Sequence, residues 1–152
     1  MINIKTTLLT FCLMAATALS VFAGDSAAEK AFVEKFKKAY EANDSATLKS
    51  FLYTKDAHPM ALEFYEMMIV EGAGSKISKI ELVDLTPEEL KNAQGTQEGP
   101  DGKKTTMPIK PTKKLVFTVD QSSASGSGSS TSSPLVAEKD GKFVIPVPAP
   151  AK

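Results

Sequence analysis

The sequence predicts an α+β domain in which three N-terminal helices pack on a curved, mostly antiparallel sheet of three to four strands. Helical periodicity dominates the first part of the chain after residue 24. Short runs rich in Val, Ile and Phe, separated by turn residues, dominate the second part. A run of helices followed by a run of strands is typical of folds whose helices lie on one face of an antiparallel sheet.

The first 23 residues have the features of a secretory signal peptide. Lys5 precedes an apolar or small-residue stretch over 6–22, and Ala23 ends a small-residue cleavage pattern. A membrane anchor is the alternative, but the apolar stretch is short for one. We therefore expect an exported protein, periplasmic or secreted, that begins at Gly24 and keeps no stable membrane anchor after processing. Residues 24–147 are predicted to form one domain, followed by a stiff Pro-rich tail over 148–152.

Composition excludes several kinds of chemistry. Cys12 is the single cysteine and lies in the predicted leader, so the mature chain offers no disulfide, thiolate nucleophile or cysteine-bound zinc. All the basic residues are lysines, which removes bidentate guanidinium clamps. The mature net charge is near −1, so no nucleic-acid partner is expected. One histidine and no clustered ligand spacing predict no metal site, and nothing indicates a cofactor.

The first predicted helix covers residues 27–42 and is amphipathic. Ser26 and Glu29 form the pattern of a capping box at its start. Phe32, Phe36 and Tyr40 recur at helical spacing and give it one apolar face, which we expect to pack on the sheet.

Two further helices are predicted before the sheet. Residues 46–53 form the second, with Phe51 on its buried edge. Residues 60–70 form the third, with Pro59 in its first turn. This third helix is almost entirely apolar and includes Tyr65 and Met68. Two interpretations stay open for it, core packing and a dimer or ligand surface.

The second part of the chain predicts strands. Residues 77–85 and 113–121 have strand character, and Thr86 starts a brief helix between them. Residues 95–111 are expected to form an exposed loop. The Ser/Gly segment over 122–133 predicts a flexible loop inside the sheet. The runs 135–139 and 142–147 flank Asp140-Gly141, which is a strong hairpin signal.

The two ends of this domain resemble a known superfamily. Residues 32–44, with Ala39-Tyr40 followed by Asp44, and the closing residues 139–145 are similar to domains of the nuclear-transport-factor-two-like (cystatin-like) superfamily. The resemblance implies a cone-shaped α+β domain with a pocket between sheet and helices, often dimeric through the sheet. The helix at Thr86 and the Ser-rich segment depart from that pattern. Six residues are the candidates for lining such a pocket: Phe32, Phe36, Tyr40, Phe51, Tyr65 and Met68.

The candidates for function fall into different classes. The first is an exported non-catalytic binding or accessory module with an apolar pocket, holding a small apolar ligand or a peptide, either as a monomer or as a homodimer. The alternative is an isomerase- or dehydratase-like enzyme that uses Tyr40 with Asp120 or a nearby glutamate. A third is a stress or envelope protein whose Ser-rich loop makes surface contacts. We assign no catalytic residue, because Asp120 and His58 are both expected to face solvent.

Overall fold

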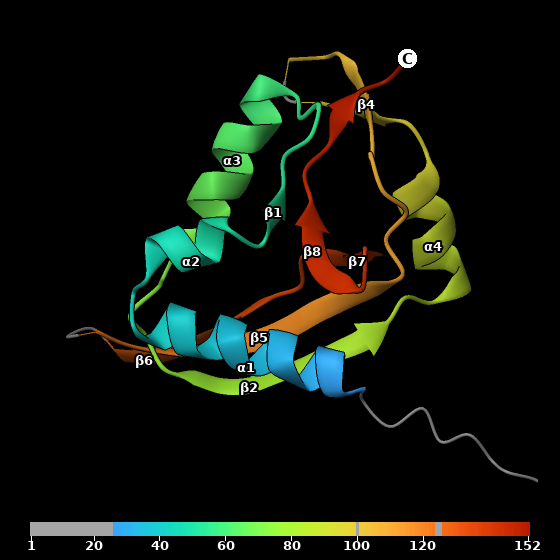
Figure 1. Ribbon diagram of the computed structural model, residues 1–152. Coiled ribbons are helices and arrows are strands. Elements are labelled where there is room, and N and C mark those ends of the chain that lie inside the picture. Colours follow the sequence, from blue (N-terminus) through green and yellow to red (C-terminus); the bar gives the residue numbers. More distant parts are fainter. Residues whose placement is uncertain (1–25, 100, 124–125) are drawn as a thin grey trace, which may run out of the picture.

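The computed structural model describes residues 26–99, 101–123 and 126–152 of this 152-residue chain. The predicted signal peptide over 1–23 lies outside the described residues. The described part is an α+β fold with four helices, a six-stranded mixed sheet and a separate three-stranded sheet (Figure 1). The predicted arrangement of three N-terminal helices on three to four strands is therefore wrong. Five of the strands lie in segments that were predicted as helix, loop or tail.

The helices of the first part begin where their capping residues predict. Helix α1, Ala27–Glu41, starts with the expected capping box, in which Ser26 and Glu29 each accept the other's backbone N–H. Helix α3, Pro59–Val70, likewise begins at its proline. Helix α2, Ser45–Lys49, is shorter than predicted, because the chain then forms strand β1, Leu52–Tyr53. This strand pairs in parallel with strand β8, Lys142–Pro146, which follows much later in the sequence.

The second part begins with elements that the sequence also indicates. Strand β2, Ile77–Asp84, pairs antiparallel with strand β5, Lys113–Ser123. Between them lies helix α4, Pro87–Gln94, capped by Thr86 and Glu89. The expected hairpin is confirmed: strands β7, Leu135–Lys139, and β8, Lys142–Pro146, meet at Asp140-Gly141, both with positive φ.

The Ser/Gly segment is partly strand, which corrects the prediction of a flexible loop over 122–133. Strand β6, Gly126–Ser132, pairs with β5 along its whole length. Strand β7 then continues the same antiparallel register on β5. The two strands are separated where Pro134 has no N–H to donate, although its carbonyl still accepts from Leu115. Backbone pairing thus orders a segment that has few side chains to bury.

A small second sheet closes the fold. Strands β3, Gln97–Glu98, and β4, Lys104–Thr106, form a short hairpin in the region predicted as an exposed loop. Strand β9, Ala149–Pro150, pairs with β4, so the predicted Pro-rich tail over 148–152 is partly a strand. Pro150 is tolerated because it lies at the end of an edge strand.

The hydrophobic core lies between α1 and the large sheet, and α1 crosses β5 and β2 (Figure 1). Phe36 is fully buried and its ring lies 5.3 Å from that of Phe117 on β5 and 5.6 Å from that of Phe51. Such aromatic contacts add stability beyond the burial of area alone. Helix α3 does not complete this layer tightly, and a cavity remains beneath it.

Candidate functional site

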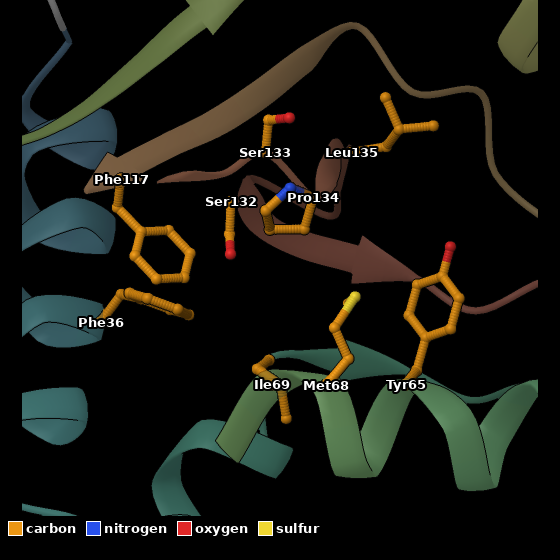
Figure 2. Close-up of a pocket in the computed structure, with 9 residues that line it drawn as sticks. All are labelled: Phe36, Tyr65, Met68, Ile69, Phe117, Ser132, Ser133, Pro134 and Leu135. Atoms are coloured by element: carbon orange, nitrogen blue, oxygen red, sulfur yellow. The ribbon is translucent and has the colours of Figure 1, made fainter. Parts of the chain in front are cut away.

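An apolar cavity lies between α3, the inner face of α1 and the junction of β6 with β7 (Figure 2). Its volume is about 290 Å³. At about 30 Å³ for each water-sized group, this space accommodates about ten non-hydrogen atoms. It is therefore near the lower end of the usual range for small-molecule sites.

One wall of this cavity comes from α3. Tyr65, Met68 and Ile69 project from the helix toward the sheet (Figure 2). Positions 65, 68 and 69 share one helix face, because residues three and four apart are neighbours on a helix surface. Ile69 is buried at 3% exposure, whereas Tyr65 and Met68 are half-buried. Ile69 thus anchors α3 at one end of the cavity, whereas the cavity is accessible to solvent beside Tyr65 and Met68.

The opposite wall comes from the interrupted strand. Ser132, Ser133, Pro134 and Leu135 border the cavity where β6 gives way to β7. Pro134 has no N–H to donate, so the pairing with β5 is interrupted here, although β6 and β7 keep the same register. Phe36 and Phe117 close the inner end (Figure 2). The cavity therefore lies where an apolar helix covers the junction of these two strands.

The polar groups of this site are hydroxyls. Tyr65, Ser132 and Ser133 bring the side-chain oxygens, and Ser132 points into the cavity (Figure 2). Burial raises the pKa of Tyr65 above its ordinary 10.0, so the phenol stays neutral at physiological pH. None of the described residues that line the cavity carries a charge. This lining can hold an apolar body and donate or accept one or two hydrogen bonds.

Three of the six predicted pocket residues line this cavity, namely Phe36, Tyr65 and Met68. Phe32 and Phe51 instead pack on each other with ring centroids 5.3 Å apart, and they border a separate surface hollow. Sequence reasoning missed the contribution of 132–135, because a Ser/Gly segment has no apolar period. The proline after this segment was the one signal that the strand is interrupted.

Tyr40, the sixth candidate, lies in the core instead of the cavity. Its side chain is 2% exposed, and its hydroxyl donates to the carbonyl oxygen of Glu71 at 2.6 Å. Burial, with a smaller contribution from the Glu71 carboxylate, raises the pKa of Tyr40. Gly72 lies so close that a Cβ there would be 2.7 Å from the phenol oxygen. The hydroxyl therefore fastens the C-terminal end of α3 to α1.

The carboxylate expected to accompany Tyr40 in an enzyme is elsewhere. Asp120 is exposed on β5, where its carboxylate accepts a hydrogen bond from Ser78. The structure thus does not bring Tyr40 and Asp120 together. The isomerase-like interpretation required a buried carboxyl beside the Tyr40 hydroxyl, and the partner recorded there is a backbone carbonyl.

His58 was expected at the surface, and this expectation is wrong. The side chain is buried at the start of α3, and its Nε2 lies 3.1 Å from a carboxylate oxygen of Asp101. The backbone N–H of His58 donates to the carbonyl of Pro148. The residue therefore joins α3 to the loop between β3 and β4 and to the C-terminal strand, away from the residues that line the cavity.

The described residues also bear on two other kinds of interaction, with metal ions and with membranes. No group of three or more His, Cys, Asp or Glu residues there is placed to hold a metal ion. Within the same residues, no helix has the length and apolar character needed to cross a membrane.

Comparisons of the chain with protein families, with curated proteins and with solved structures find no match.

Proposed function

We propose that this protein is a non-catalytic binding protein that holds a small, neutral, apolar ligand in the cavity beneath α3. The observation that carries the proposal is the lining itself, in which Phe36, Phe117, Ile69 and Met68 surround a volume of about 290 Å³ with hydroxyls as its polar side chains. Ligand sites are mostly apolar, with a few polar groups that fix orientation.

Binding accounts for this lining better than catalysis does. General acid–base chemistry requires a titratable pair held in a pocket, with at least one pKa shifted toward neutrality. The shift at Tyr65 goes the other way, because burial raises its pKa. Tyr40 uses its hydroxyl to hold Glu71. The groups that border the cavity can therefore orient a ligand but offer no proton exchange near neutral pH.

Export completes the proposal. The pattern of residues 1–23 supports a cleaved signal peptide, so the ligand would be met outside the cytoplasm. Intact-mass measurement of the protein purified from its expressing cells tests this part. A mass that begins at Gly24 is the expected result, and a mass that retains residues 1–23 contradicts it.

A pair of variants on β6 tests ligand binding. Ser132 borders the cavity, whereas Thr131 lies on the other face of the strand and contacts Thr118. Ser132→Phe should fill part of the cavity, while Thr131→Phe leaves it open. Positions 131 and 132 are both exposed, and aromatic residues are common in strands, so the two variants are matched in their expected effect on folding.

The assay is titration with N-phenyl-1-naphthylamine, a neutral dye that fluoresces in apolar surroundings. Its naphthalene ring matches the size of the cavity, and its phenyl ring extends outside. The unaltered protein and Thr131→Phe should bind it with similar affinity, and Ser132→Phe should bind it at least about tenfold more weakly, since the loss of a few buried carbons has this effect. Equal binding by all three proteins would show that the dye does not enter this cavity, and would contradict the proposal.

A further inference from the structure

The apolar surface of α3 does not stop at the cavity. Met60, Phe64 and Met67 are 45%, 50% and 61% exposed and form what we call the α3 ridge. Positions 60, 64 and 67 are helix neighbours at spacings of four and three, so these side chains form one stripe. Large apolar side chains gathered on one exposed helix face are unusual in a soluble protein and mark an interaction surface.

The ridge is continuous with the cavity wall. Phe64 is four residues before Met68, which places the two side chains side by side on the helix, and Met68 lines the cavity. The ring of Phe64 also contacts that of Tyr65 edge-on, with centroids 6.1 Å apart, and Tyr65 lines the cavity too. An apolar chain that leaves the cavity past Met68 and Tyr65 therefore meets the ridge directly.

The size of the cavity indicates why the ridge is needed. About ten non-hydrogen atoms fill the enclosed space. A longer hydrocarbon chain has to extend outside, where water opposes its exposure. Methionine and phenylalanine at the ridge give such a chain an apolar, adaptable surface.

The charges beside the ridge select the head group. Glu63 is exposed and lies between Met60 and Met67 on the helix surface. Glu66 is three residues after Glu63, and its carboxylate pairs with the Lys49 ammonium at 2.8 Å. Glu71 follows the end of the helix. These carboxylates would repel an anionic head group at the ridge. They would also repel the carboxylates of a second copy of the protein docked on the same ridge. A head group without negative charge avoids this repulsion.

We infer that the ligand is a single-chain amphiphile whose head group carries no negative charge, whose chain end fills the cavity and whose remaining methylenes lie along the α3 ridge. This inference rests on the proposed function, because it assigns the chemical class of the ligand for the same cavity. It adds a second binding surface, formed by Met60, Phe64 and Met67.

Alkyl maltosides of increasing chain length provide the test. The octyl compound fits the cavity, the decyl compound fills it and the dodecyl compound exceeds it. Affinities are measured by displacement of N-phenyl-1-naphthylamine below the critical micelle concentrations. Each fully buried methylene strengthens binding about fourfold, so octyl to decyl should gain about 15-fold. Methylenes on a half-exposed ridge gain less, and we expect about fourfold from decyl to dodecyl.

The variant Phe64→Ser removes the centre of the ridge, and Glu63→Ser at the neighbouring position is the control. Phe64→Ser should keep the octyl-to-decyl gain and lose the gain from decyl to dodecyl. Glu63→Ser should keep both gains. Dodecanoate should bind the unaltered protein more weakly than dodecyl maltoside, and Glu63→Ser should reduce that difference.

Three outcomes would overturn the inference while leaving the proposed function intact. The dodecyl compound could keep its extra affinity in Phe64→Ser, which would exclude a contact with the ridge. Sedimentation could show a dimer that Phe64→Ser dissociates, which would make the ridge a protein interface. Binding of the protein to neutral phospholipid vesicles, lost in Phe64→Ser, would make it a membrane contact. Failure of every maltoside and of the dye to bind contradicts the proposed function itself.

Discussion

Gly72→Ala tests whether the Tyr40 hydroxyl is committed to α3 or free to serve a site. Gly72 has φ +73°, and a Cβ on it would lie 2.7 Å from the Tyr40 oxygen. Gly141 supplies a matched control, because it has the same φ and no atom within 4 Å of its would-be Cβ. Both substitutions carry the backbone cost of an L-residue at positive φ, and Gly72→Ala alone disturbs a hydrogen bond.

The expected losses of unfolding free energy follow from the backbone cost and from the disturbed hydrogen bond. Alanine in the left-handed region costs about 1–2 kcal/mol of unfolding free energy, which is the whole expected effect of Gly141→Ala. Displacing the Tyr40 hydroxyl from the Glu71 carbonyl leaves polar groups unpaired in the core, at a further cost of about 1–3 kcal/mol. Gly72→Ala should therefore destabilise the protein by about 2–5 kcal/mol.

Tyr40→Phe separates the backbone cost from the cost of the lost hydrogen bond. Without the hydroxyl oxygen, the Tyr40 atom nearest to the added Cβ is the ring carbon Cζ at 3.9 Å, an ordinary contact distance. In a Tyr40→Phe background, Gly72→Ala should cost no more than Gly141→Ala. The double-mutant cycle should thus show a coupling of about 1–3 kcal/mol between the two positions.

Urea denaturation followed by far-ultraviolet circular dichroism provides the free energies. The reasoning is refuted if Gly72→Ala and Gly141→Ala cost the same in the presence of Tyr40. Such a result would mean that the hydroxyl does not occupy the space beside Gly72, and the question whether Tyr40 serves the cavity would be open again.

Three other predictions follow from the structure. Phe36→Ala should lower the free energy of unfolding by about 3–5 kcal/mol in urea denaturation, whereas the exposed Phe64→Ala should change it by less than about 1 kcal/mol; similar losses would contradict the assigned burial. Thr86→Ala removes the cap of α4 and should cost about 1 kcal/mol in the same assay; no change would mean that the cap contributes nothing. Burial raises the pKa of Asp101, but hydrogen bonds from Lys103 and the charges of His58 and Lys103 together outweigh it and hold that pKa below 3.8. The carboxylate therefore adds stability above pH 3.8 that is lost as the pH falls through the lowered value. Asp101→Asn should therefore lower the melting temperature at pH 7 and no longer do so once wild-type Asp101 is protonated; a pH-independent difference would exclude the charge as the cause.

Local signals in the sequence predicted several elements correctly. The capping boxes at Ser26 and Thr86 start α1 and α4, and Asp140-Gly141 closes the hairpin of β7 and β8. These signals are reliable because the groups that interact lie within about four residues of one another. The apolar face of α1 also predicted the burial of Phe36 and Tyr40.

The candidate pocket was only partly predictable. Apolar periodicity indicated that Phe36 faces inward, whereas core packing and a contact surface both stayed open for Tyr65 and Met68. Such patterns do not distinguish a residue that fills the core from one that borders a space. Tyr40 and Tyr65 are both tyrosines on apolar helices, yet one donates to the Glu71 carbonyl and the other lines the cavity. That difference depends on where α3 ends relative to α1, which no local pattern specifies.

The sequence by itself determined the helix starts, the hairpin and the apolar faces, because each depends on neighbouring residues. The tertiary structure alone decided that Leu52–Tyr53 is a strand beside β8, that Gly126–Ser132 pairs with β5, and that the chain end pairs with β4. Backbone N–H and C=O groups make these contacts, and every residue except proline carries both. A segment of serine and glycine can therefore become a strand once a distant partner presents a free edge, and the cavity lies where Pro134 interrupts that pairing.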